Sequence, residues 1–460
     1  MAGRYKSYGK YNDSNIEWIG QVPEHWEASY LGFECSVKAR LGWKGLKAEE
    51  YVDDGYVFLA TPNIKDNEID FSNVNRITKE RYDESPEIML EKGDVLVTKD
   101  GSTTGTTNII RVLPEPATVN SSIAVLRSKG HILSEYLYYF FVSEYTQNLI
   151  NRMRGGMGVP HLFQADLRKF NILIPTEREQ RFIASFLDHE TAKIDTLIEK
   201  QKQLIHLLKE KRRAVISHAV TKGLNANAKM RDSGVEWLGQ VPENWDVCSI
   251  KYRCKEITDG AHISPVTEDG ERYFISTKDI KNGDINFDHA LLTTPTSFEY
   301  MVKTGCRPFA GDILFSKDGT IGQTAIAPEG VEFVVASSLI IIRPNKSLVT
   351  SQYFNFMLQS DAVAEQVNSL VKGAGLPRLS IQNLLKVGGT FPPIYEQIEI
   401  AAYLSNKLVR YDELESIASL KVKLLQERRT ALISAAVTGK IDVRNWIDPR
   451  ASKTNKEVAA

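Results

Sequence analysis

The sequence predicts an α/β (α+β) protein made of two similar mixed α/β globules, each followed by a long helix. A helical pattern with regularly spaced apolar residues runs from Pro175 to Gly223 and recurs from Pro393 to Thr438. Arg212 in the first copy matches Arg429 in the second, a shift of 217 residues (429 − 212). Ahead of each copy lie short apolar segments separated by Gly, Pro, Asn and Asp, a pattern typical of strands and turns.

The long helices are predicted to pair with each other as a coiled coil. Thr176 and Glu179 form an S/T-x-x-E arrangement, in which each side chain can bond a free backbone N–H, so we expect the first helix to begin at Thr176. Pro393 takes a place in the first turn of the second helix, where its missing N–H costs nothing. Apolar residues then recur at steps of three and four, as in a coiled-coil seam. The predicted seam of the first helix is Ile183, Leu187, Ile194, Leu197, Leu204, Leu208 and Val215.

Short strands and one further helix are predicted in each globule. In the first globule the strands are Tyr56–Leu59, Val95–Thr98, Thr107–Arg111 and Ser122–Arg127, followed by a helix over Ser134–Arg154. In the second globule they are Tyr273–Ser276, Ile313–Ser316, Thr324–Ala327 and Leu339–Arg343, followed by a helix over Thr350–Lys372.

Composition places the chain among globular proteins without a membrane span. Of its 460 residues, 42% are hydrophobic and 25% charged, as in typical globular domains. No stretch approaches the roughly 18 apolar residues that cross a bilayer, and the polar start, Met1–Asp13, lacks a signal-peptide core. We therefore expect a cytoplasmic protein. Its four cysteines lack zinc-ligand spacing and are expected to be reduced thiols.

The net charge of −1 argues against non-specific coating of nucleic acid, which requires an excess of Lys and Arg. It does not exclude a sequence-specific binder. Charge is distributed unevenly along the sequence. The segments Lys38–Lys47 and Gln366–Lys386 contain basic residues and no acidic residue. Such patches are commonly solvated faces, so they carry little weight alone.

A tryptophan-containing segment opens each half, Asn15–Trp26 in the first and Gly234–Trp245 in the second. Its Gly and Pro residues predict turns. We expect the two tryptophans of each copy to pack against a core, which is a commoner role than ligand binding.

A Lys-Asp-Gly loop also occurs twice, as Lys99–Gly101 and Lys317–Gly319, in each case after an apolar strand. Small polar residues follow it, but the G-x-x-x-x-G-K-[ST] spacing of a phosphate-binding loop is absent. Two interpretations stay open: a tight hairpin that uses glycine at positive φ, or a contact with nucleic acid.

Glycine-rich stretches follow the helix of each globule, at Gly155–Gly158 and Gly373–Gly375. Cations flank them, and a flexible backbone beside cations can approach a phosphodiester closely. A helix C-cap followed by a connector is the alternative.

Catalytic motifs are missing from the sequence. The Asn/Asp-Pro-Pro-Tyr/Phe loop of amino-group DNA methyltransferases is absent, since its closest match, Phe391–Ile394, lacks the polar first residue. No Gly-rich cofactor fingerprint follows a strand, and no Ser/His/Asp or Cys/His spacing stands out. The chain is therefore expected not to catalyse a reaction by itself.

Taken together, the duplicated motifs resemble the specificity (S) subunits of Type I restriction-modification systems. They are the Glu-Trp-x-Gly-Gln-Val-Pro-Glu-x-Trp segment (Glu17–Trp26 and Glu236–Trp245), the Pro-x-x-x-Glu-Gln helix start (Pro175–Gln180 and Pro392–Gln397), the matching Ala-Val-Thr helix ends and Asp259–Pro265. The resemblance covers almost the whole chain.

This resemblance implies a DNA-recognition protein with a pseudo-two-fold internal repeat. Each globule would recognise one half of a split sequence in double-stranded DNA, and the helices would pair antiparallel as a spacer and docking surface. Two methyltransferase (M) subunits carrying S-adenosylmethionine would assemble around the chain, together with two restriction (R) subunits that use ATP and Mg. No cofactor or metal is expected on this chain. The implied segments are recognition domain 1 (1–175), a helical spacer (176–225), recognition domain 2 (226–392), a second spacer (393–445) and a disordered tail (446–460).

Candidate DNA contacts follow from position and chemistry. In the first half they are Lys38, Arg40, Lys44, Lys99, Ser102, Thr103, Thr104, Asn120, Ser121, Arg154 and His161. In the second half they are His262, Lys317, Thr320, Gln323, Ser337, Lys372 and Arg378. Two alternative functions remain: an enzyme that modifies DNA unaided, and a protein scaffold that does not touch DNA.

Overall fold

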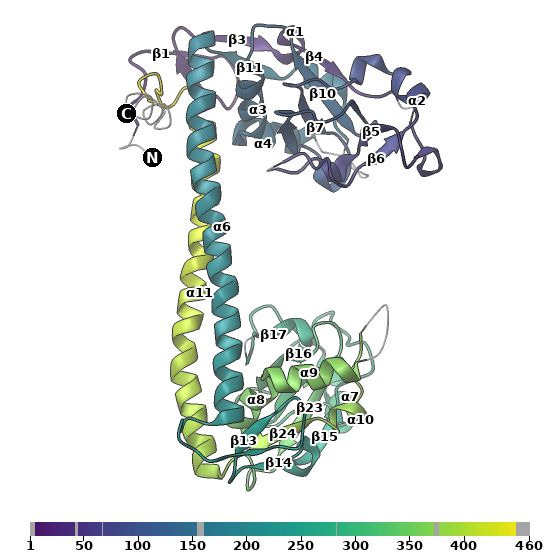
Figure 1. The fold of residues 1–460 in the computed structure, drawn as a ribbon, viewed down its shortest axis with the longest axis vertical. Helices are drawn as coiled ribbons and strands as arrows, with labels where there is room; N and C mark the ends of the chain where they lie inside the picture. Colours follow the sequence, from purple (N-terminus) through teal and green to yellow (C-terminus); the bar gives the residue numbers. More distant parts are fainter. Residues whose placement is uncertain are drawn as a thin grey trace. The chain divides into compact units, whose positions relative to one another are not determined.

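The computed structural model describes residues 5–41, 45–66, 68–153, 161–281, 283–371 and 377–447. The chain divides into two compact units (Figure 1). Unit 1 comprises residues 1–201 and 420–460, and unit 2 comprises residues 202–419. Each long helix therefore contributes one part to each unit. The predicted disordered tail lies largely outside the described residues.

The two long helices, α6 (Glu177–Lys222) and α11 (Ile394–Val437), are confirmed. Thr176 caps α6 as predicted: its hydroxyl lies 3.4 Å from Glu179 N and 2.7 Å from Glu179 Oε2, and the same carboxylate accepts from Thr176 N. Pro393 lies one residue before the first helical residue of α11, and its carbonyl accepts from Gln397 N.

Both long helices are followed by a glycine with positive φ. Gly223 has φ +75° and Gly439 has φ +70°, a conformation that ends helices because glycine has no Cβ to clash. A Cβ on Gly439 would lie 2.3 Å from Pro23 Cδ. The end of α11 is therefore packed closely against the segment that opens the chain.

Within each unit, α6 and α11 are joined by an ion pair. In unit 1 Arg429 Nε lies 2.9 Å from Asp195 Oδ1, and in unit 2 Arg212 Nη1 lies 3.4 Å from Asp412 Oδ1. Lys209 also pairs with Glu415 in unit 2, at 3.4 Å. Between these two pairs the residue number increases by three on α6, from 209 to 212, and decreases by three on α11, from 415 to 412. The two helices thus run antiparallel in this unit.

The predicted seam of α6 is only partly correct. Ile183, Leu187 and Ile194 are buried, but Leu197 and Leu204 are exposed. The buried and half-buried residues instead follow the strict seven-residue repeat that pairing with α11 requires: Ile194, Ile198, Gln201, Ile205, Leu208, Arg212, Val215 and Ala219. The prediction failed at the two leucines because it followed apolar residues, whereas this seam includes Gln201 and Arg212.

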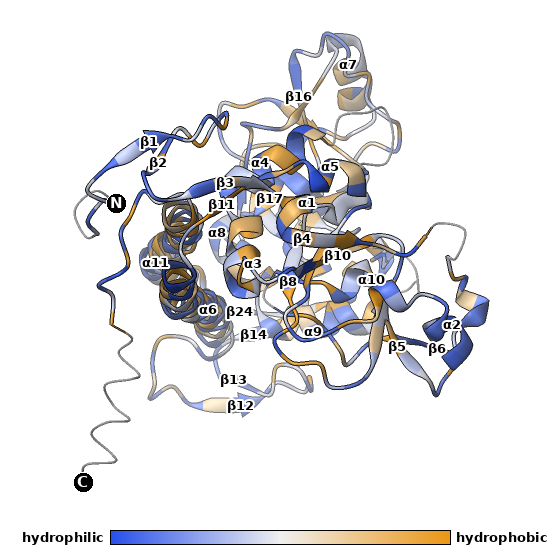
Figure 2. Ribbon diagram, turned by 90° about the horizontal axis from the view of Figure 1, so that it is seen from above, coloured by the Kyte–Doolittle hydropathy of each residue, from blue (hydrophilic) through white to orange (hydrophobic). Residues whose placement is uncertain are grey.

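Unit 1 is built on a four-stranded antiparallel sheet in the order β4-β10-β7-β8. Its strands are β4 (Cys35–Lys38), β10 (Ile123–Ser128), β7 (Val95–Thr98) and β8 (Thr107–Ile109). A three-stranded sheet holds β6 (Asn75–Ile77), β5 (Tyr56–Leu59) and β9 (Ala117–Val119), and the β5–β9 pair is parallel. Two-stranded pairs join β1 (Tyr11–Asp13) to β2 (Gln21–Pro23) and β3 (Glu27–Tyr30) to β11 (Asn171–Ile174). In Figure 2, β10 is strongly hydrophobic and the short helix α2 (Lys79–Asp83) is hydrophilic.

Unit 2 repeats this plan. Its four-stranded sheet has the order β15 (Cys254–Asp259), β23 (Leu339–Pro344), β20 (Ile313–Ser316) and β21 (Thr324–Ile326). The three-stranded sheet holds β19 (Leu291–Thr293), β16 (Arg272–Ile275) and β22 (Phe333–Val335), again with one parallel pair. Two-stranded pairs are formed by β12 (Met230–Asp232) with β13 (Gln240–Pro242), β14 (Asp246–Ser249) with β24 (Gly388–Phe391), and β17 (Ile280–Lys281) with β18 (Asp284–Ile285). The predicted strands are thus confirmed, with ends shifted by at most two residues.

The single helix predicted near the end of each globule is wrong, because each is two helices. They are α3 (Ser134–Val142) with α4 (Glu144–Met153), and α8 (Ser351–Leu358) with α9 (Asp361–Leu370). A serine restarts the helix in both units: Ser143 Oγ lies 3.4 Å from Thr146 N, and Ser360 Oγ lies 3.4 Å from Val363 N. The other helices are α1 (Leu31–Glu34), α5 (Gln164–Arg168), α7 (Pro295–Lys303) and α10 (Ile381–Leu384). None of the helices in the described ranges could cross a membrane.

A buried tyrosine ties the end of α11 to the core of unit 1. The Tyr136 hydroxyl shares its one hydrogen between Leu173 O, at 3.1 Å, and Val437 O, at 3.2 Å. Burial holds the pKa of Tyr136 well above its usual value, so the hydroxyl remains a donor. Tyr353 makes the equivalent bond to Val220 O at the end of α6.

Tyr136→Phe is expected to lower the free energy of unfolding by about 1–2 kcal/mol, because two buried carbonyls lose a donor. Urea unfolding of the full chain measures this change. Tyr30→Phe is the matched control, since Tyr30 is half exposed and its loss of a hydroxyl should change the value by less than about 0.5 kcal/mol. Equal effects of the two substitutions would contradict the assigned role of Tyr136.

Candidate nucleic-acid interface

The two Lys-Asp-Gly loops form equivalent clusters, one in each unit. Lys99 N donates to Ser122 O at 2.7 Å, and Lys317 N donates to Ser338 O at 2.9 Å. Lys99 O accepts from Leu162 N and Lys317 O accepts from Leu379 N, both at 2.9 Å. Each loop is therefore held between two other segments. Loop cluster 1 denotes residues 99–104, 120–122 and 161–162, and loop cluster 2 denotes residues 259–262, 317–323, 337–338 and 378–379.

A bond between an aspartate and a basic side chain closes each cluster at its surface. Arg378 Nε and Nη2 lie 2.8 and 3.2 Å from the two carboxylate oxygens of Asp318. In loop cluster 1 the Asp100 carboxylate bonds His161 Nδ1. Both pairs lie just after the glycine-rich stretches, which fall outside the described residues. These bonds to a carboxylate fix His161 and Arg378 against the two Lys-Asp-Gly loops.

Loop cluster 2 also brings His262 to the lysine. Ala261 forms a bridge with Ala336, and Ser337 N donates to Ala261 O at 2.9 Å. Asp259 then bonds both side chains: its Oδ1 lies 2.5 Å from Lys317 Nζ and its Oδ2 lies 3.1 Å from His262 Nε2. Three of the predicted contacts, His262, Lys317 and Ser337, thus belong to one site.

Most of the remaining predicted contacts lie at the surface. Those that are exposed or half-exposed are Lys38, Ser102, Thr103, Asn120, Ser121, His161, Thr320, Gln323 and Arg378. Lys38 lies on β4 beside Val125 of β10, whereas the others belong to the two loop clusters. Lys44, Arg154 and Lys372 lie outside the described residues. All of these contacts stay predictions.

Besides Lys317, two predicted contacts, Arg40 and Thr104, are buried and bonded internally. Arg40 Nε donates to Val119 O at 3.2 Å, and its Nη1 lies 3.4 Å from Ser85 Oγ. Thr104 Oγ1 donates to Gly101 O at 2.7 Å, which is a turn contact. Both side chains stabilise the fold around the sheet and the loop, so the interface proposed below does not include them.

Sequence reasoning missed the acidic residues that organise the clusters, Asp100, Asp318 and Asp259. A signal was available for each. The first two follow the lysine directly in both repeats, and Asp259 precedes His262 by three residues. A hydrogen-bond partner for each acid would have been the physical expectation, since a partly buried carboxylate is stabilised by one.

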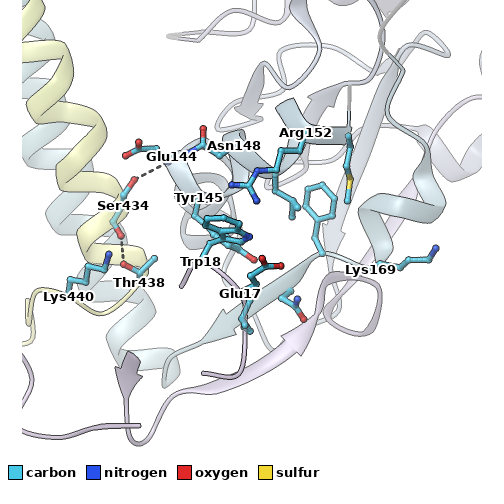
Figure 3. Close-up of a pocket in the computed structure, with 15 residues that line it drawn as sticks. Glu17, Trp18, Glu144, Tyr145, Asn148, Arg152, Lys169, Ser434, Thr438 and Lys440 are labelled. Carbon is cyan, nitrogen blue, oxygen red and sulfur yellow. Dashed lines mark hydrogen bonds between the residues drawn. The ribbon is translucent and has the colours of Figure 1, made fainter. Parts of the chain in front are cut away.

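A pocket of about 480 Å³ lies in unit 1 beside the tryptophan segment (Figure 3). The Arg152 guanidinium lies over the Trp18 ring, 3.9 Å from its centre, in a cation–π contact. Ser434 Oγ of α11 accepts from Glu144 N at 2.9 Å and so caps α4 at the edge of this pocket.

The prediction that both tryptophans of each segment pack into a core is wrong for one of them. Trp26 and Trp245 are buried, but Trp18 is 66% exposed and Trp237 is 42% exposed. The reason is a tight turn: Asp13 Oδ1 accepts from Asn15 N, and Ser14 N donates to Gly20 O, both at 2.9 Å. This turn directs Trp18 toward solvent, and Asp232 and Ser233 form the same turn in unit 2.

Groups of three or more His, Cys, Asp or Glu side chains that could hold a metal ion do not occur within the described ranges. The two loop clusters instead offer hydroxyls, amides and cations at a surface, which are the groups that bind phosphates and base edges.

Relatives of this chain are specificity subunits. A Methanocaldococcus jannaschii protein, the type I restriction enzyme MjaVIII specificity subunit, is 22% identical over 92% of this chain and 95% of its own length. The Escherichia coli K12 type I restriction enzyme EcoKI specificity subunit is 19% identical over 92% of this chain and 90% of its own length. A solved chain from a type I R-M system superposes with a TM-score of 0.67 at 16% identity, covering 90% of this chain and 98% of that one, which shows a shared fold.

The family model for the Type I restriction modification DNA specificity domain matches twice, at residues 35–207 and 242–421. The two matches contain the two four-stranded sheets and their Lys-Asp-Gly loops. Together they span well over half of the sequence. This chain belongs to the type I restriction-modification DNA specificity family.

Proposed function

We propose that this chain is the DNA sequence-recognition subunit of a type I restriction-modification complex. Each globule recognises one half of a bipartite target in double-stranded DNA. The observation that carries this function is the pair of loop clusters, built by the same backbone bonds in two halves of a chain that belongs to the specificity family. Their exposed polar side chains suit contacts with phosphates and with base edges in the major groove.

The chain itself is non-catalytic. Its relatives are named as specificity subunits, and the sequence lacks the methyltransferase loop and a cofactor fingerprint. Methyl transfer from S-adenosylmethionine and ATP- and Mg-dependent restriction then belong to partner subunits. A target adenine would be flipped into the methyltransferase subunit. We place the complex in the cytoplasm, where cellular DNA is accessible to it.

The long helices supply a docking surface for two methyltransferase subunits, and the full complex also holds two restriction subunits. Within unit 2, Leu414 is 48% exposed and Ile417 is 54% exposed. They lie three residues apart, hence on one face of α11. Leu204 and Leu207 of α6 are exposed as well. Apolar residues that a helix pair leaves in solvent are typical of a surface that another protein covers.

The helices also act as the spacer. α6 has 46 residues and α11 has 44, so at 1.5 Å per residue each is about 65–70 Å long. One turn of DNA is about 34 Å. Helices of this length can link two recognition modules in one chain, so that two weak half-site contacts act as one tight contact.

Footprinting of the assembled methyltransferase complex on its methylated target tests this function. We expect protection of two short tracts separated by an unprotected gap. Absence of protection would favour the scaffold alternative. A second assay incubates the purified chain alone with labelled S-adenosylmethionine and DNA; methyl transfer by the chain alone would favour the stand-alone enzyme.

A further inference from the structure

The lysines at the centres of the two loop clusters have equivalent backbones but different surroundings. Lys99 is 5% exposed and Lys317 is 6% exposed. The positive charge of Lys317 is balanced within the protein by an ion pair, because its Nζ lies 2.5 Å from Asp259 Oδ1. The two clusters therefore differ in how they compensate a buried cation.

Lys99 lacks the corresponding carboxylate. Ile123 pairs with Thr98 as Leu339 pairs with Ser316, which aligns β10 with β23. Lys38, which pairs with Val125, then corresponds to Thr258, which pairs with Ile341. The residue after Lys38 is Ala39 and the residue after Thr258 is Asp259. Alanine cannot accept a hydrogen bond at the place where Asp259 accepts one.

No other group in the described ranges replaces that carboxylate. Lys99 Nζ makes no hydrogen bond or ion pair there. Asp100 is the adjacent acid, but its carboxylate is bonded to His161. Burial lowers the pKa of Lys99, and the attraction of Asp100 offsets only part of this effect. Most of the Lys99 side chain is buried, and a largely desolvated cation without an acceptor is costly, so an acceptor from outside the chain would stabilise it.

The neighbouring groups are suited to DNA. Ser102, Thr103, Asn120 and Ser121 belong to the same loop cluster and are exposed or half-exposed, and Ser122 O accepts from the backbone N–H of Lys99. These side chains present hydroxyls and an amide beside the cation. Together they can contact several acceptor atoms of one short stretch of nucleic acid.

We infer that the Lys99 ammonium donates to an acceptor atom of the first DNA half-site, either a phosphate oxygen or a base-edge acceptor such as guanine O6 or N7. Lys317 is instead committed to Asp259 inside the protein. Lys99 is thus a specificity-determining or anchoring residue of the first half alone. This inference rests on the proposed function, and it assigns different roles to two lysines that the repeat makes equivalent.

The test compares Lys99→Met and Lys317→Met in the chain co-purified with its methyltransferase partner. Lys99→Met should leave the melting temperature equal or higher, because it removes an uncompensated buried charge, and should weaken DNA binding about 10- to 100-fold. Lys317→Met should lower the melting temperature by about 5–10 °C, because Asp259 loses its lysine partner and keeps only the bond to His262. If that variant does not fold, Lys317→Met combined with Asp259→Leu should recover the melting temperature.

Two further arms locate the acceptor. If Lys99 contacts a phosphate, Lys99→Met should weaken binding equally on all DNA sequences. The slope of log affinity against log salt concentration should then fall by about the value for one phosphate contact. A base contact predicts relaxed preference at one position of the first half-site, with the second half-site unchanged. The control is Lys129→Met, which removes an exposed cation at the other end of β10 and should change affinity by less than about twofold.

Unchanged affinity and sequence preference of Lys99→Met would overturn the inference. So would a fall in melting temperature equal to that of Lys317→Met, because it would show an internal partner for Lys99. Failure of the proposed function would look different, since the wild-type complex would then show no sequence-specific binding.

Discussion

Trp245→Ala is expected to lower the free energy of unfolding by about 3–5 kcal/mol, the range for removing a large buried aromatic side chain. Trp245 is 1% exposed and packs in the core that contains Ile216 and Val220 of α6 and Leu404 of α11. Its Nε1 also donates to Glu396 Oε2 at 2.8 Å, at the start of α11. Loss of this side chain would therefore loosen the packing of both long helices within unit 2. Urea unfolding followed by circular dichroism measures the change.

Trp237→Ala is the matched control, because it removes the other tryptophan of the same segment. Trp237 is 42% exposed, so its replacement should lower the free energy of unfolding by about 1 kcal/mol or less. If both substitutions destabilised the chain equally, the packing described for this segment would be wrong.

Replacing Leu414 and Ile417 together by Glu is expected to abolish co-purification of the methyltransferase subunit. The two side chains are exposed in this chain, so folding should be little affected. Truncation of a central apolar contact typically costs about 2–4 kcal/mol in binding, and burying a carboxylate there adds a further penalty. A weakening of more than about 100-fold is expected in a pull-down titration.

Ser416→Glu is the control for that experiment. Ser416 is exposed and lies about 100–200° around α11 from the two apolar residues, on another face. It should leave partner binding unchanged within about twofold. Retention of the partner by the Leu414→Glu/Ile417→Glu variant would show that this face is not the docking surface.

The long helices and the repeat could be predicted from the sequence because their signals are local and occur twice. The capping residues Thr176 and Glu179 lie three positions apart, and the strand at Val95–Thr98 is a continuous apolar run between turn residues. Such patterns need no knowledge of distant contacts.

Other features depend on tertiary contacts and could not be predicted in this way. The break at Ser143 leaves apolar periodicity intact on both sides, and a second bond at the start of α4 comes from Ser434, which is distant in sequence. The exposure of Trp18 follows from a turn whose bonds involve Asp13 and Ser14. The inclusion of Gln201 in the helix seam is decided by α11.

The candidate site was predictable as a set of loops but not as a set of roles. The repeated Lys-Asp-Gly string located Lys99 and Lys317 correctly in equivalent loops. Their different partners depend on one position of a neighbouring strand, Ala39 in one half and Asp259 in the other. Residues 58 apart, such as Asp259 and Lys317, can be paired only once the sheet register is known.

The central claim is that each half of one chain recognises its own half of a split DNA target. Its most direct test is methylome sequencing of the host carrying either this chain or a chimera in which residues 27–174 come from another member of the family. The account predicts a bipartite methylated-adenine motif that is lost when the gene is deleted, and a chimera that changes one half of the motif while keeping the other half and the gap. A chimera that forms the complex but changes both halves, or a motif with no dependence on this chain, would contradict the claim.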